Sequence, residues 1–145
     1  MVCLDTSFII ALLRRDEGAL TKLEEYTASQ TRLTTTPITA CELFKGAYKS
    51  TKRDKELQKV KKALSFLEVL DFSVEASERY GRLMASEGLK GAPIGDLDAM
   101  IASIALTHGE DVVTSNLKHF ERVEGLHLDS WSTTHQYSGG LSRAP

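Results

Sequence analysis

Acidic and amide side chains recur where predicted strands end or where the following helices begin. The acids are Asp5, Glu42, Asp96 and Asp98, and the amide is that of Asn116, which follows Thr114 and Ser115. In open α/β sheets, functional groups gather beyond the carboxyl ends of the strands. We therefore expect these side chains to meet at one edge of a sheet. No histidine accompanies them in this pattern, and the chain lacks a glycine-rich phosphate loop of the GxxxxGK[ST] type.

Carboxylates without imidazole or thiolate partners form the ligand set that a hard cation such as Mg²⁺ or Mn²⁺ prefers. Several carboxylates a few ångströms apart would repel one another and raise each other's pKa. Bound divalent cations would remove that repulsion, activate a water molecule and stabilise charge on a phosphodiester. The pattern therefore indicates an acidic metal site.

Each of these residues also has a structural alternative. Asp5 could cap the helix that follows it. Glu42, three residues before Lys45, could form a surface ion pair on its helix. Acids in a first helical turn suit the helix dipole, and an asparagine is a natural helix cap; these alternatives apply to Asp96, Asp98 and Asn116.

The elements that must position these residues alternate between strand and helix. Apolar, β-branched segments predict strands at Met1–Leu4, Arg32–Thr35, Leu67–Phe72, Asp111–Thr114 and Gly125–Leu128. Helical spacing predicts helices at Thr6–Arg15, Glu17–Ser29, Pro37–Tyr48, Asp54–Phe66, Val74–Ser86 and Asp96–Thr107, with a break at Gly88–Gly91 and a short helical turn at Leu117–Phe120. This alternation favours a mainly parallel sheet with helices on both faces.

The bulk properties suit one soluble domain. The chain has 145 residues, 41% of them hydrophobic, and a net charge of −2. No apolar run approaches the roughly 20 residues that span a bilayer, and the start lacks a signal-peptide pattern, so we expect a cytoplasmic protein with buried free thiols at Cys3 and Cys41. Residues 1–131 are expected to form the domain, and 132–145 a flexible polar tail.

Positive charge is concentrated in one segment, although the whole chain is slightly acidic. Between Lys45 and Lys62 there are eight basic residues against two acids. A solvated helix face is the structural alternative, whereas the functional interpretation is a surface that follows an RNA backbone beside the acidic site. The residues proposed to bind RNA are Lys45, Lys49, Lys52 and Arg53.

Four stretches in this order resemble the PIN-domain family, and within it the VapC-type toxins of toxin–antitoxin pairs. They are LDTSFIIALL, TTTPITACELFKGAYKS, IGDLDAMIASIAL and VVTSNLKHFERVEGL, followed by Trp131. The resemblance spans nearly the whole chain. It implies a three-layer α/β/α fold with a mainly parallel central sheet and an acidic pocket.

By motif match, the resemblance gives Asp5, Glu42 and Asp98 the roles of the three family acids. It implies metal-dependent cleavage of RNA by an activated water, with Mg²⁺ or Mn²⁺ as the cofactor. Family members often carry a further acid where this sequence has Asn116, and Asp96 is the residue that could compensate. Thr6, Ser7, Thr114 and Asn116 would support the site. A cognate antitoxin and a homodimer are the implied partners.

Two alternatives remain beside this hypothesis. Because Asn116 is neutral, the chain could be a PIN-like module that binds RNA or protein with little or no catalysis. A phosphatase of the haloacid dehalogenase type also begins with an acid after its first strand, but that family needs a second aspartate two residues later. This chain has Ser7 at that position.

Overall fold

A computed structural model describes residues 1–87 and 94–131 of the chain. At its centre is a sheet of five strands in the order β3-β2-β1-β4-β5. All four strand pairings are parallel, as the alternation of elements predicted. The strands are β1 (Val2–Leu4), β2 (Leu33–Thr35), β3 (Glu68–Val69), β4 (Asp111–Val113) and β5 (Leu128–Asp129).

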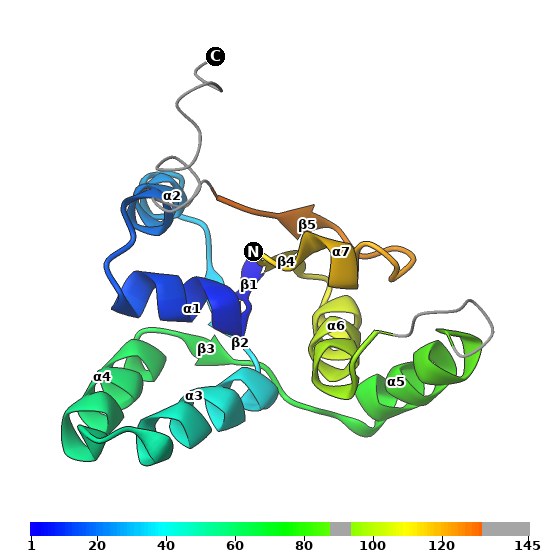
Figure 1. Cartoon of the computed structure of the whole chain (residues 1–145). Coiled ribbons are helices and arrows are strands. Elements are labelled where there is room, and N and C mark those ends of the chain that lie inside the picture. The colour runs from blue at the N-terminus through cyan, green and yellow to red at the C-terminus, as the bar shows by residue number, and fades with distance from the viewer. Residues whose placement is uncertain (88–93, 132–145) are drawn as a thin grey trace, which may run out of the picture.

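Helices cover both faces of the sheet, so the fold has the expected three layers (Figure 1). Four of them pack on one side: α1 (Thr6–Leu13), α2 (Glu17–Ala28), α3 (Pro37–Lys49) and α4 (Arg53–Ser65). On the other side lie α5 (Val74–Glu87), α6 (Asp96–His108) and the short α7 (Leu117–Phe120). No helix in the described residues is long and apolar enough to cross a membrane.

The two hydrophobic cores follow from the alternation of side chains along the strands. In β1, Cys3 joins the core under α6, whereas Val2 and Leu4 join the core under α1 and α3. In β4, Val112 joins the core under α6, and Val113 joins the core under α1 and α3. Successive residues of a strand face opposite sides of a sheet, so a strand buried on both faces must be apolar at every position.

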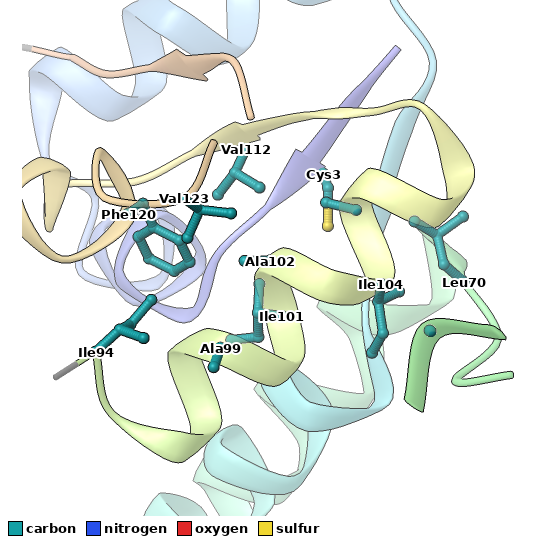
Figure 2. Close-up of a cluster of buried hydrophobic side chains, with 12 residues drawn as sticks. Cys3, Leu70, Ile94, Ala99, Ile101, Ala102, Ile104, Val112, Phe120 and Val123 are labelled. Carbon is teal, nitrogen blue, oxygen red and sulfur yellow. The ribbon is translucent and has the colours of Figure 1, made fainter. Parts of the chain in front are cut away.

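Helix α6 is buried along most of its length, as its composition predicted. Small and branched side chains line it, and they let it approach β1 and β4 closely (Figure 2). The helix ends at Gly109, whose φ of +70° lies in the left-handed region that glycine adopts without strain. This close packing fixes the start of α6, where Asp98 lies, against the end of the sheet.

Several expectations need correction. The last strand covers Leu128–Asp129 rather than Gly125–Leu128, because Gly125 has a φ of +84° and belongs to the preceding turn. Strand β3 is only two residues long and lies at the edge of the sheet. Cys41 is an exposed thiol, whereas Cys3 is buried as expected. The predicted break at Gly88–Gly91 and the predicted tail at 132–145 lie outside the described residues.

The described chain ends by packing back onto its beginning. The ring centroids of Trp131 and Phe8 are 4.7 Å apart, with the planes inclined at 62°. Both residues are buried, and such edge-to-face pairs stabilise a core beyond the area they bury. Residue 131 therefore belongs to the core under α1.

The order of the strands changes direction between β1 and β4. From β1 the chain continues through α1 and α2 to β2 on one side, and from β4 it continues through α7 to β5 on the other. The connections at the carboxyl ends of these neighbours therefore diverge. In open parallel sheets, ligands bind at such a point.

Candidate active site

Asp5 directly follows β1 at this point, and hydrogen bonds to four chain groups hold it in place. Its backbone N–H donates to the carbonyl of Val113 in β4 at 3.0 Å. Its Oδ1 accepts from the backbone N–H of Thr6 at 2.7 Å. Its Oδ2 accepts from Ser7 Oγ at 3.1 Å and from Thr114 Oγ1 at 2.7 Å. Asp5 thus caps α1, as the structural alternative proposed, and is also fixed to β4.

The carboxyl group of Asp5 is nearly inaccessible, with only 2% of the residue exposed. Burial raises its pKa above the ordinary value, and the nearby charge of Asp98 raises it further, against the lowering effect of the hydroxyl and N–H donors. The surroundings of the Asp5 side chain therefore disfavour its ionised form. A nearby cation would relieve that cost.

Glu42 reaches the same site from α3. Thr6 Oγ1 donates to Glu42 Oε1 at 2.6 Å, so Thr6 binds both Asp5 and Glu42. Thr39 Oγ1, one turn earlier on α3, lies 3.2 Å from Thr6 Oγ1. Glu42 forms no ion pair with Lys45 in the described structure, so its observed partner is a site hydroxyl.

Asp98 lies in the first turn of α6 and has a partner that the sequence analysis missed. Its Oδ2 lies 3.0 Å from Nδ1 of His119 in α7. Because an ionised carboxylate can only accept, Nδ1 of His119 is the donor. The expectation that no histidine accompanies the acids is therefore wrong. The position of His119, three residues after Asn116 beyond the same strand, was the available signal.

Asp96 faces a different partner from Asp98. Its Oδ1 accepts from the Tyr80 hydroxyl of α5 at 2.6 Å. Positions two apart on a helix lie about 200° apart around its axis, so Asp96 and Asp98 point in different directions. Within residues 1–87 and 94–131, no three acid, histidine or cysteine side chains are grouped closely enough to hold one ion. The expected cluster of several carboxylates around one ion is thus not found there.

The residues after β4 support Asp5 through hydroxyl and backbone groups. Thr114 Oγ1, which donates to Asp5, accepts from the backbone N–H of Asn116 at 2.9 Å. The N–H of Ser115 donates to Ser7 Oγ at 3.0 Å. Asn116 begins α7, but its side chain makes no capping hydrogen bond. The supporting residues predicted from the sequence therefore meet at Asp5, and the Asn116 amide is exposed beside them.

This donor set fits a hard divalent cation. The charge of Asp98 acts on the buried carboxyl group of Asp5, and Glu42 is joined to Asp5 through Thr6. Mg²⁺ is commonly held by one or two protein carboxylates, with water and substrate phosphate completing its six ligands.

Beyond Glu42, the surface is hollowed between α1, α3 and α4. The hollow has a volume of about 460 Å³, and its lining includes Ile10, Arg14, Glu42 and Lys59. Its walls are mixed, with apolar residues from all three helices and charged groups at several points. Glu42 thus belongs both to the acidic site and to this concave surface between α1, α3 and α4.

Comparison with known proteins identifies one family and several relatives. The family model of the PIN domain matches residues 2–126. The tRNA(fMet)-specific endonuclease VapC of Salmonella typhimurium is 38% identical over 108 residues, which are 74% of this chain and 82% of that protein.

Solved structures agree with this result. The crystal structure of VapBC2 from Rickettsia felis, bound to a DNA fragment from its promoter, contains a chain with a TM-score of 0.83 and 32% identity. The match covers 91% of this chain and 100% of that one. A toxin–antitoxin complex from Klebsiella pneumoniae has a TM-score of 0.69 and 25% identity over 87% of this chain and 95% of the matched one.

Proposed function

Because the chain belongs to the PIN-domain family, we propose that it is a metal-dependent endoribonuclease that hydrolyses phosphodiester bonds of RNA. The observation that carries the proposal is the buried carboxylate of Asp5 at the carboxyl end of β1, whose pKa is raised by burial and by the nearby charge of Asp98. The names of its relatives, which are ribonucleases and a tRNA endonuclease, support RNA as the substrate.

The proposed roles follow from the contacts. Asp5 and Asp98 would hold Mg²⁺ or Mn²⁺, which supplies an activated water and neutralises charge on the phosphate. Glu42, fixed by Thr6, would orient the attacking water, and the exposed amide of Asn116 would contact the scissile phosphate. Asp96 is bound to Tyr80, so we assign it no metal contact.

We propose further that the protein is the toxin of a type II toxin–antitoxin pair, and that its partner is a cognate antitoxin. Similar chains occur in VapBC complexes and in a toxin–antitoxin complex, and the matches cover nearly the full length of those chains. A homodimer remains a prediction of the family resemblance.

Metal addition and removal test the proposed activity. The purified protein is incubated with a mixture of structured RNAs in Mn²⁺, in Mg²⁺ and in chelator, and fragments are mapped at their ends. We expect cleavage with either metal, none in chelator, and recovery when metal is restored. Cleavage of the same strength in chelator would contradict the proposal, because the carboxylates alone supply no nucleophile.

The alternative of a binding module with little catalysis has one observation in its favour. Asn116 offers a neutral amide where the family resemblance implies an acid, and no close group of three ligands is found in the described part of the chain. Calorimetric titration with Mn²⁺ separates the two functions. A protein that binds RNA but takes up no Mn²⁺ at millimolar concentrations is the binding module.

His119 is expected to strengthen metal binding by orienting Asp98. Partners of metal ligands commonly change affinity by 10- to 100-fold when removed. We therefore expect His119→Ala to weaken Mn²⁺ binding by about 10-fold in calorimetry, and His119→Gln, which keeps an N–H donor, to weaken it less. Equal affinities for wild type and His119→Ala would show that the contact with Asp98 does not support the site.

The basic segment is expected to give RNA binding much of its salt dependence. For single strands, each neutralised phosphate contributes roughly −0.7 to the slope of log K against log salt. We expect neutralising Lys49, Lys52 and Arg53 together to flatten this slope by roughly 2. Arg82→Gln, a neutralisation on α5 at the other face, is the control. An unchanged slope in the triple variant would indicate a solvated face that does not contact RNA.

A further inference from the structure

An exposed aromatic ring lies at the tip of the hairpin formed by α3 and α4. Tyr48, in the last turn of α3, is 58% exposed and takes part in neither hydrophobic core. The guanidinium carbon of Arg53, at the start of α4, lies 5.9 Å from the ring centroid. Nε of Arg53 also donates to the backbone carbonyl of Tyr48 at 3.2 Å. The ring and the guanidinium are thus held together across the turn.

The turn between the two helices is ordered by its own hydrogen bonds. The backbone N–H of Lys52 donates to Ser50 Oγ at 3.0 Å, and that of Ser50 donates to the carbonyl of Ala47 at 3.1 Å. Helices α3 and α4 pack along each other behind this turn (Figure 1). Tyr48 and Arg53 therefore lie on a turn that is already ordered. Binding there loses less conformational entropy than binding to a flexible turn would.

Unpaired positive charge surrounds the ring. In the described structure, the one ion pair made by a basic residue of the segment from Lys45 to Lys62 is that of Lys59 with Glu56. Lys45, Lys49 and Lys52 have no acidic partner within 4.0 Å among the described residues. An aromatic side chain among cations without partners is the combination that binds single-stranded nucleic acid, through bases and phosphates respectively.

The positions of these residues on α3 connect the tip to the acidic site. At 1.5 Å per residue, Tyr48 lies about 9 Å further along the helix axis than Glu42. At about 100° per residue, Lys49, Lys45 and Tyr48 are turned from Glu42 by about 20°, 60° and 120° in the same sense. Both lysines thus lie on the arc between the acid and the ring. Gly46, which lines the hollow, is turned the other way.

We propose that Tyr48, backed by Arg53, is a stacking platform for an unpaired base of the RNA, a few nucleotides from the scissile phosphate. Lys45 and Lys49 contact the backbone between the two points. The platform selects RNA whose bases are exposed near the cleavage point, such as a loop, over a continuous duplex. This inference rests on the proposed nuclease function and assigns a substrate contact outside the acidic site.

Steady-state kinetics on an RNA that the wild type cleaves test the platform. Loss of a stacked base costs roughly 5- to 100-fold in affinity, so we expect Tyr48→Leu to raise KM by about 10-fold with kcat nearly unchanged. Tyr48→Phe and Tyr48→Trp, which keep a ring, should retain a KM near that of the wild type. Phe66→Leu, which removes another exposed aromatic at the far end of α4, is the matched control.

Direct binding separates stacking from charge. In an Asp98→Asn background with chelator, anisotropy of a labelled 12-nucleotide single strand gives affinity at several salt concentrations. We expect Tyr48→Leu to lower the affinity without changing the salt slope, because stacking releases no counterions. We expect Lys49→Gln to flatten the slope.

Three results obtained with the variants would overturn the platform. They are an unchanged KM and affinity in Tyr48→Leu, an equal loss in Tyr48→Phe, and a change of oligomeric state in Tyr48→Leu that accounts for the loss. The proposed function fails separately, if the wild type cleaves no RNA with any metal. The binding experiment still decides the platform in that case, since it needs no cleavage, and failure of the wild type to bind RNA also overturns it.

Discussion

Replacing Asp98 with asparagine is expected to lower metal-dependent RNA cleavage by roughly 10³-fold, because a metal site contributes several kcal/mol to the transition state. Asparagine has the same shape and keeps one oxygen to accept from His119 Nδ1. The substitution therefore removes a negative charge from the site with little change in packing. Cleavage under single-turnover conditions in Mn²⁺ measures the effect on the chemical step.

Asp96→Asn is the matched control, because Asp96 lies in the same helical turn and has the same side chain. Its carboxylate accepts from Tyr80 and faces α5, so we expect cleavage within a few-fold of the wild type. If the two variants lose activity equally, the distinction between the two acids is wrong, and Asp96 has the compensating role that the sequence suggested. If neither loses activity, the catalytic site lies elsewhere.

Asp5→Asn should show opposite effects on activity and on stability. We expect a loss of cleavage of roughly 10³-fold, as for Asp98, since Asp5 is a proposed metal ligand. In chelator at neutral pH, however, the variant should melt a few degrees above the wild type. The amide removes a buried charge, and the hydroxyls of Ser7 and Thr114 can turn to accept from it.

The higher melting temperature of Asp5→Asn should depend on pH, because the pKa of Asp5 is raised, mainly by burial. A raised pKa means that the folded chain holds the proton more tightly than the unfolded chain. Protonated Asp5 thus contributes stability that is complete below the ordinary value of 3.8 and is lost as the pH rises through the raised value. The difference in melting temperature between Asp5→Asn and the wild type should therefore grow as the pH rises from 3.8 through the raised pKa, and it should vanish at lower pH.

Melting curves in chelator at several pH values, and then in Mn²⁺, check both effects. Mn²⁺ should raise the melting temperature of the wild type and leave that of Asp5→Asn nearly unchanged, because ligand binding stabilises only a chain that binds it. A variant that is less stable than the wild type in chelator at neutral pH would show that the carboxylate is held by its donors more strongly than burial opposes it.

Local sequence signals predicted most of the fold because each element is strongly marked. Thr36 and Pro37 predicted the start of α3, and the Thr36 side chain accepts a hydrogen bond from the N–H of Thr39. The small apolar residues of α6 predicted its burial. The strands whose bounds were predicted wrongly are β3 and β5, which are two residues long and lie at the edges of the sheet. Few side chains specify such short strands, and they depend on pairing with β2 and β4.

The site was predicted less completely because its partners are distant in the sequence. Thr6 and Ser7 were expected beside Asp5 from adjacency alone. Nothing local indicates that His119 contacts Asp98 or that Tyr80 binds Asp96, since these contacts depend on how α5, α6 and α7 pack. The type of a residue and its position after a strand can identify an acid as a candidate site residue. The direction in which its side chain points depends on how the helices pack.

The contacts at Asp5 have a consequence for biosynthesis. Thr114, which donates to Asp5, follows it by 109 positions, and the α6 acid comes almost as late. A ribosome adds roughly 5 to 20 residues per second, so for several seconds each growing polypeptide contains α1–α4 without Asp98 and Thr114. During that interval the nascent chain cannot assemble the candidate site, because Asp5 lacks the hydroxyl of Thr114 that holds it.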